Sequence, residues 1–72
     1  MKAKVNDKII TIINMKSEFS DRLIPSGTEG IVIECFDNPE MYYVDLMIPE
    51  NDLVGDFSWE NLSLTPEQFT VT

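Results

Sequence analysis

The sequence contains no histidine and only one cysteine, and these two shortages exclude most catalytic chemistry. Histidine is the side chain that most often moves protons near neutral pH, and the lone Cys35 has no neighbouring base to activate it as a nucleophile. Zinc sites need several Cys or His ligands. Cys35 cannot form a disulfide within the chain, and we interpret it as a small buried hydrophobic residue. We therefore expect no enzymatic activity, no metal and no cofactor.

Long hydrophobic runs are also missing, although 43% of the 72 residues are hydrophobic. The apolar runs are a few residues long, far short of the roughly 20 that a membrane-spanning helix needs. Residues 1–7 lack the apolar segment of a secretory signal. We expect a single small domain that is cytoplasmic and does not enter a membrane.

Basic residues are absent from the last fifty positions. The five that exist are Lys2, Lys4, Lys8, Lys16 and Arg22, so that residues 1–22 carry +2 and residues 23–72 carry −10. Such a field repels nucleic-acid phosphates and attracts cationic surfaces. Solubility alone favours an acidic surface, but a merely soluble surface usually mixes both signs. The charge pattern predicts a protein partner with a basic surface and no direct nucleic-acid binding, and it leaves the oligomeric state open.

Apolar residues alternate with a period of two, which is typical of strands. The alternation predicts strands at residues 8–13, 29–36, 41–48 and 53–59, and a short fifth strand at 63–65. Residues 14–27 hold Ser, Pro and Gly breakers and are predicted to form a long first loop, while 60–62 are predicted to form a 3₁₀ turn. Gly27 is expected at a positive φ, and Gly30 is expected at a bend or a close backbone approach. Together these elements predict an all-β fold, a small five-stranded SH3-like barrel over residues 5–65. Residues 66–72 are predicted to form a C-terminal tail that is pinned by Phe69 and Val71.

Three segments carry a resemblance to a known family: residues 27–34 (GTEGIVIE), 43–46 (YVDL) and 57–64 (FSWENLSL). They resemble a family of short bacterial proteins of unknown function with an SH3-like, KOW-type barrel, and the likeness covers most of residues 5–65. The chain departs from the family at Trp59-Glu60-Asn61, where a Leu-Pro pair is usual. The resemblance implies the barrel fold and, for some relatives, toxin–antitoxin or immunity gene contexts. It implies no catalytic residues.

The acidic residues also predict which side of each strand faces solvent, because a carboxylate does not point unpaired into so small a core. Glu34, Asp45 and Asp56 therefore mark the outer side. Alternation then places the following residues inside: Ile31, Ile33, Cys35, Tyr42, Val44, Leu46, Ile48, Leu53, Gly55, Phe57 and Trp59. The outer side carries the candidate partner-binding residues Glu34, Tyr43, Asp45, Met47, Val54 and Asp56. An aromatic and Met centre with a charged rim is typical of a docking surface, although an ordinary half-solvated sheet shows the same alternation.

These features predict a non-catalytic acidic binding protein, most simply an inhibitor, immunity or antitoxin-type protein that covers a basic surface of its partner. Two alternatives stay open. One is an accessory SH3-like interaction module of a larger cytoplasmic assembly. The other is an SH3 analogue that grips an extended peptide, for which the candidate residues are Glu18, Phe19 and Asp21 in the long loop together with Trp59.

Overall fold

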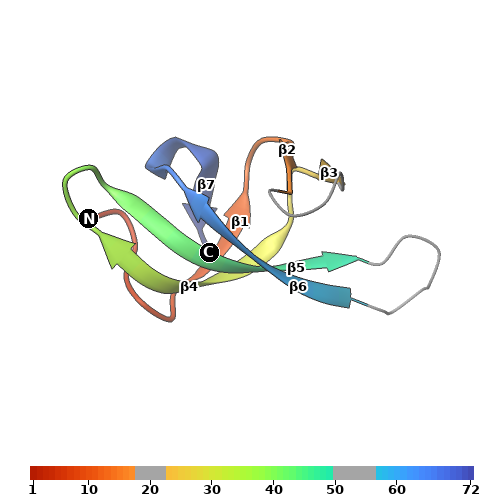
Figure 1. Cartoon of the computed structure of the whole chain (residues 1–72), viewed down its shortest axis with the longest axis horizontal. Coiled ribbons are helices and arrows are strands. Elements are labelled where there is room, and N and C mark those ends of the chain that lie inside the picture. The colour runs from red at the N-terminus through yellow and green to blue at the C-terminus, as the bar shows by residue number, and fades with distance from the viewer. Residues whose placement is uncertain (18–22, 50–56) are drawn as a thin grey trace.

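The computed structural model of the chain describes residues 1–17, 23–49 and 57–72 (Figure 1). Its main sheet is antiparallel and has the strand order β6-β5-β4-β1-β7. These strands are β1 (Lys8–Thr11), β4 (Glu29–Phe36), β5 (Met41–Pro49), β6 (Phe57–Leu64) and β7 (Phe69–Val71). A small second sheet pairs β2 (Met15–Lys16) with β3 (Leu23–Ile24), and a 3₁₀ helix, η1 (Pro66–Gln68), precedes β7. The described ranges contain strands and no α-helix, so the prediction of an all-β chain is confirmed.

The two central strands agree best with the sequence prediction. β4 has the predicted bounds, and β5 extends the prediction by one residue to Pro49. β1 ends at Thr11, two residues earlier than predicted. Between β1 and β4 the described residues are irregular apart from β2 and β3, which pair with each other and which the alternation did not indicate. Runs that are bounded by turn residues on both sides therefore gave the most accurate strand bounds.

The C-terminal part differs from the prediction. Residues 57–64 form one strand, because β6 pairs with β5 without interruption from Leu64 opposite Tyr42 to Phe57 opposite Pro49. The predicted 3₁₀ turn at 60–62 is wrong. The 3₁₀ helix of the structure, η1, lies at Pro66–Gln68 instead. Pro66 occupies the start of the helical turn, and the Gln68 side chain accepts a 2.8 Å hydrogen bond from the Thr65 N–H.

Residues 66–72 are part of the fold and not a tail. They contain η1 and β7, and β7 pairs with β1. The Phe69 side chain is fully buried and meets the Tyr42 ring edge-on, with ring centroids 5.2 Å apart and an interplanar angle of 81°. Such a T-shaped contact is the preferred aromatic geometry and adds to the area that the two rings bury.

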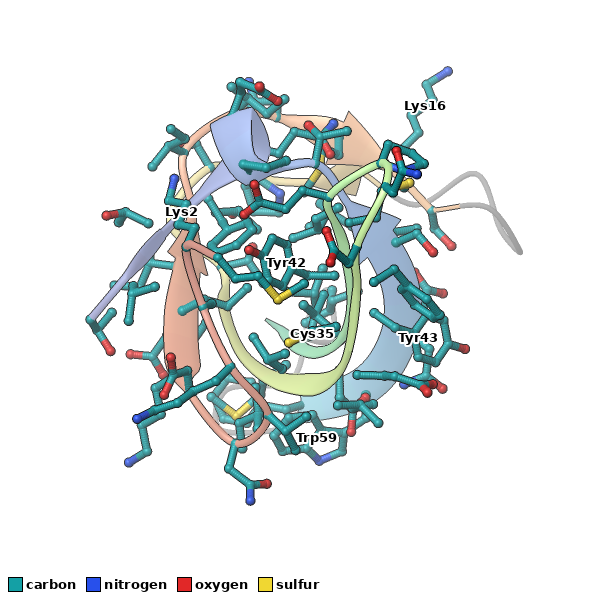
Figure 2. The ribbon with its side chains drawn as sticks, turned by 90° about the vertical axis from the view of Figure 1, so that its left-hand side faces the viewer. Lys2, Lys16, Cys35, Tyr42, Tyr43 and Trp59 are labelled. Atoms are coloured by element: carbon teal, nitrogen blue, oxygen red, sulfur yellow. The ribbon has the colours of Figure 1, made fainter. Side chains whose placement is uncertain are left out.

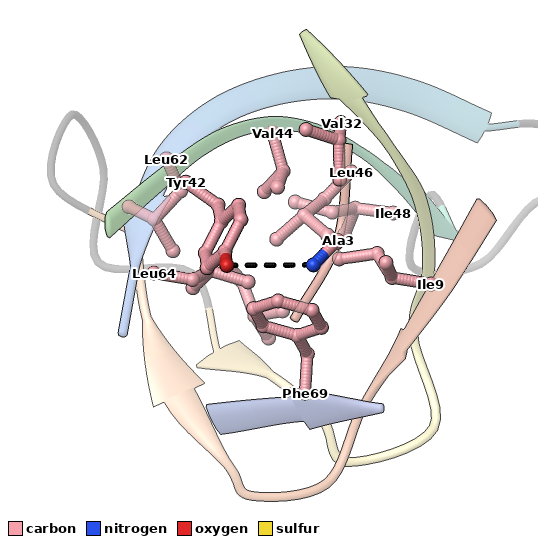
Figure 3. Packing of buried hydrophobic residues seen from close by; sticks show 11 residues of the cluster. Ala3, Ile9, Val32, Tyr42, Val44, Leu46, Ile48, Leu62, Leu64 and Phe69 are labelled. Atoms are coloured by element: carbon pink, nitrogen blue, oxygen red, sulfur yellow. Dashed lines mark hydrogen bonds between the residues drawn. The ribbon is translucent and has the colours of Figure 1, made fainter. Parts of the chain in front are cut away.

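The main sheet curls around its core (Figure 2, Figure 3). β6 and β7 are the two edges of the sheet order, and no pairing joins them in the described ranges. The core consists of Ala3, Ile9, Ile24, Val32, Tyr42, Val44, Leu46, Ile48, Leu62, Leu64 and Phe69. The pairings thus show a curled sheet, and its closure into a five-stranded barrel stays a prediction.

A β-bulge in β4 changes which residues of that strand point inward. The register against β5 shifts between Val32 and Glu34, so that Ile33 is an extra residue. Val32 is fully buried, Ile31 is half-buried and Ile33 is 42% exposed, so the predicted inward orientation of Ile31 and Ile33 is wrong. Beyond the bulge the predicted faces hold, because Glu34 is exposed and Cys35 packs against the core. Cys35 is half-buried, however, and not buried as the sequence predicted.

The predicted faces of the fourth strand are also wrong. Phe57 and Trp59 are 51% and 55% exposed, while Leu62 and Leu64 of the same strand are buried. Alternation counted back from these two leucines puts both aromatic residues on the outer side. The prediction depends on Asp56, which lies outside the described residues, as do Leu53 and Gly55.

Gly27 and Gly30 have the backbone roles that the sequence predicted. Gly27 has a φ of +92°, and no atom lies within 4 Å of the position where its Cβ would be. At Gly30 a Cβ would lie 2.6 Å from Leu46 Cδ2 and 2.9 Å from the Asp45 carbonyl oxygen. Gly30 therefore permits the close contact between β4 and β5.

We expect Gly30→Ala to lower the free energy of unfolding by about 1–3 kcal/mol, because the added methyl overpacks the contact with Leu46. Urea titration followed by tryptophan emission measures the change. Gly27→Asn is the matched control and should cost less, because asparagine tolerates the left-handed region and the site is open. Equal losses in the two variants would contradict this account of Gly30.

We expect Phe69→Ala to cost about 3–5 kcal/mol and Phe57→Ala about 1 kcal/mol or less, because only the first ring is buried in the core. Thermal unfolding of the two variants makes the comparison. A loss for Phe69→Ala of about 1 kcal/mol or less would contradict the assignment of residues 66–72 to the fold.

Candidate functional site

The outward side of β4, β5 and β6 is the candidate site. We call it the outer face and define it by Ile31, Glu34, Tyr43, Asp45, Met47, Trp59, Asn61 and Ser63. Its members follow from β5, where Tyr42, Val44, Leu46 and Ile48 are buried and the residues between them point the other way. Figure 2 shows Tyr43 and Trp59 directed away from the curled sheet and Tyr42 directed into it.

Strand register decides which outer-face residues are neighbours. Tyr43 lies between Glu34 on β4 and Ser63 on β6, and Met47 lies opposite Trp59. The structure therefore brings four of the predicted partner-binding residues, Glu34, Tyr43, Asp45 and Met47, onto one face. Trp59, predicted inside by alternation but also considered for peptide binding, belongs to this face as well.

The other predicted site residues lie outside the described ranges. They are Val54 and Asp56 of the main candidate set, and Glu18, Phe19 and Asp21 of the long-loop set.

The outer face combines apolar and acidic groups. Tyr43 and Met47 are half-buried and Trp59 is 55% exposed, so their rings and thioether offer apolar area to a partner. Glu34 is exposed, and the carboxylate of Asp45 accepts a 3.1 Å hydrogen bond from Asn61 Nδ2, which fixes its position. Such groups can bind a protein surface or a side chain. Three or more metal-ligating side chains do not come together anywhere in the described ranges.

A surface cavity of about 250 Å³ adjoins the outer face where β4 lies between β1 and β5. It is lined by Lys8, Ile9, Glu29, Gly30, Ile31, Met47, Trp59 and Thr72. No motif in the sequence indicates this cavity. Its residues come from five strands or strand ends, and no spacing along the chain indicates that Lys8 and Trp59 share one cavity.

A second polar cluster lies where the N-terminal segment meets β5. The backbone N–H of Lys2 donates to the Glu40 carboxylate (2.9 Å) and to the Tyr42 hydroxyl (2.8 Å), and the Tyr42 hydroxyl in turn donates to Glu40. The hydrogen bond from Tyr42, with a further one from Lys2, holds the pKa of Glu40 below its usual 4.5. Burial, followed by the bond to Glu40, raises the pKa of Tyr42 above 10.0. These groups satisfy one another, so we assign the cluster to folding.

No family model, curated protein or solved structure matches this chain. The likeness to the short bacterial SH3-like family therefore stays a prediction. Nowhere in residues 1–17, 23–49 and 57–72 is there a helix of the length and apolarity needed to cross a membrane.

The Glu40–Tyr42 hydrogen bond predicts how stability depends on pH. Because the folded state lowers the pKa of Glu40, its contribution is complete above pH 4.5 and is lost as the pH falls through the folded value. Because the folded state raises the pKa of Tyr42, its contribution is complete below pH 10.0 and is lost as the pH rises further.

We expect Glu40→Gln to flatten the acid side of the stability profile and to leave a decline at alkaline pH. Melting temperatures of wild type and variant across the acid and alkaline ranges provide the measurement. Parallel acid limbs in the two proteins would show that Glu40 is not a source of the acid sensitivity.

Proposed function

We propose that this protein is a non-catalytic, acidic, SH3-like binding module of the cytoplasm that covers a basic surface of a partner protein, as inhibitors, immunity proteins and antitoxins do. One observation carries the proposal. The outer face sets the apolar groups of Tyr43, Met47 and Trp59 beside the carboxylates of Glu34 and Asp45. No basic residue follows Arg22 in the chain, so this face lies in a negative field.

The SH3-like part of the proposal is supported by element order. A long first loop follows β1, three antiparallel strands (β4, β5 and β6) run in succession, and a 3₁₀ helix leads into a last strand that pairs with β1. This is the succession of elements expected for an SH3-like barrel.

The two kinds of group on the outer face would act at different stages of binding. Carboxylates steer a cationic partner during diffusion and so raise the association rate. Desolvated aromatic and Met side chains hold the complex once it has formed, and they govern dissociation. An acidic rim around an apolar centre thus selects partners by charge and retains them by contact area.

A second candidate function is recognition of an extended peptide, alone or within a larger assembly. The exposed Trp59 beside a surface cavity favours it, because SH3-type recognition of peptides relies on grooves lined by aromatic residues. A partner captured through one linear segment, and not through a folded surface, would support this second candidate.

The test begins with co-purification from the native host and then uses the purified partner. We expect Tyr43→Ala to weaken binding by about 1–3 kcal/mol, mainly through faster dissociation. Glu34→Gln removes a rim charge without changing shape, so association should slow and lose part of its salt dependence. Surface plasmon resonance at several salt concentrations separates the two effects.

The matched control is Glu67→Gln, an exposed acid on η1 away from the outer face. It should leave the association rate closer to that of wild type than Glu34→Gln does. If Tyr43→Ala and Glu34→Gln both bind the partner as wild type does, the outer face is not the docking surface.

A further inference from the structure

The cavity beside the outer face has one aromatic wall, an apolar floor and one carboxylate. Trp59 forms the aromatic wall and is more than half exposed. Met47 and Ile31 are half-buried and supply the apolar surface, and Glu29 is an exposed carboxylate. Lys8 and Thr72 line the side nearest β1.

Strand register gives the spacing of these groups. Met47 lies opposite Trp59, and the pairing of Gly30 with Leu46 places Glu29 on the strand next to Met47. Neighbouring strands are about 4.8 Å apart, so the backbones at Trp59 and Glu29 are separated by roughly 10 Å, with Met47 between them. This span accommodates one flat group that is stacked on the indole and hydrogen-bonded to the carboxylate.

We propose that this cavity binds the guanidinium group of an arginine side chain supplied by the basic partner. The inference rests on the proposed function and names the partner's anchoring residue. A guanidinium is planar, so it can stack on Trp59 while its N–H groups donate to Glu29. Its aliphatic stem then lies against Met47 and Ile31.

Charge decides between cationic and anionic guests. Glu29 lines the cavity, and Asp45 lies beside Ile31 across the strand pair, whereas Lys8 is the single basic side chain of the lining. The lining therefore holds one carboxylate and one ammonium, and Asp45 just outside it, together with the acidic character of residues 23–72, favours a cation. Lysine is a weaker candidate than arginine, because its compact ammonium neither stacks over a ring as a plane nor donates in a fork.

Trp59 is the only tryptophan of the chain, so its fluorescence reports directly on the cavity. The probes are three end-blocked pentapeptides with arginine, lysine or the uncharged arginine analogue citrulline between glycines. We expect the arginine peptide to shift Trp59 emission saturably and to bind about tenfold or more tightly than the citrulline peptide, since the charge-assisted bonds are lost in the latter. The lysine peptide should bind more weakly than the arginine peptide.

Two surface variants at the cavity sharpen the test. Glu29→Gln keeps the shape of the side chain but removes its negative charge, and it should lower the affinity for the arginine peptide about fivefold or more. Lys8→Gln is the matched control on the opposite wall, and it should bind at least as tightly as wild type because a like charge has been removed. The proposal would be overturned if the arginine and citrulline peptides bound equally tightly. It would also be overturned if Glu29→Gln bound the arginine peptide as tightly as wild type does, or if Lys8→Gln lost binding.

The failure of this inference can be told apart from failure of the proposed function. If Tyr43→Ala lowers the affinity for the purified partner while Glu29→Gln and Trp59→Phe bind it as wild type does, the outer face is the docking surface. The proposal of an arginine anchor in the cavity is then wrong. If the arginine peptide binds as expected but no outer-face variant affects the partner, the cavity assignment stands and the proposed docking surface is wrong.

Discussion

The buried ring of Tyr42 is the constraint on which the rest of the structure depends. Its ring packs against Phe69 of β7. Its hydroxyl accepts hydrogen bonds from the backbone N–H groups of Lys2 and Ala3 and donates one to the Glu40 carboxylate. Burying a hydroxyl group without hydrogen-bond partners would cost several kcal/mol of folding free energy. The N-terminal segment, the middle of the chain and its last strand are therefore held together at one residue (Figure 3).

Fixing Tyr42 inside also fixes the candidate site outside. Successive side chains of a strand point to opposite faces, so the burial of Tyr42, Val44 and Leu46 leaves Tyr43 and Asp45 on the outer face. The same strand thus supplies both the core and the proposed docking surface. For this reason the outer side chains can be exchanged with little effect on the core, while a one-residue slip of β5 would exchange the two faces entirely.

The sequence predicted the strand bounds best where turn residues delimit the apolar run, as in β4 and β5, and it predicted the buried and outward sides correctly along β5. The prediction failed where a long-range contact or a local irregularity of the strand determines which side chains are buried. The bulge at Ile33 reverses the alternation within β4 without any compositional signal, and Phe69 is buried only because β7 returns to pair with β1. Glu60 breaks the rule that acids mark the outer side, since it lies opposite the buried Leu46.

The candidate site was predictable along β5 but not across strands. Tyr43, Asp45 and Met47 follow from one strand, whereas the cavity at Trp59 exists only because β1, β4, β5 and β6 lie in that order. The structure also gives Lys2 a role in the fold. The ammonium group of Lys2 is bonded to the carbonyl oxygens of Pro66 and Phe69 and lies 4.8 Å from the centre of the Phe69 ring. One of the five basic side chains therefore stabilises the contact of the N-terminal segment with η1 and β7, while its charge stays exposed.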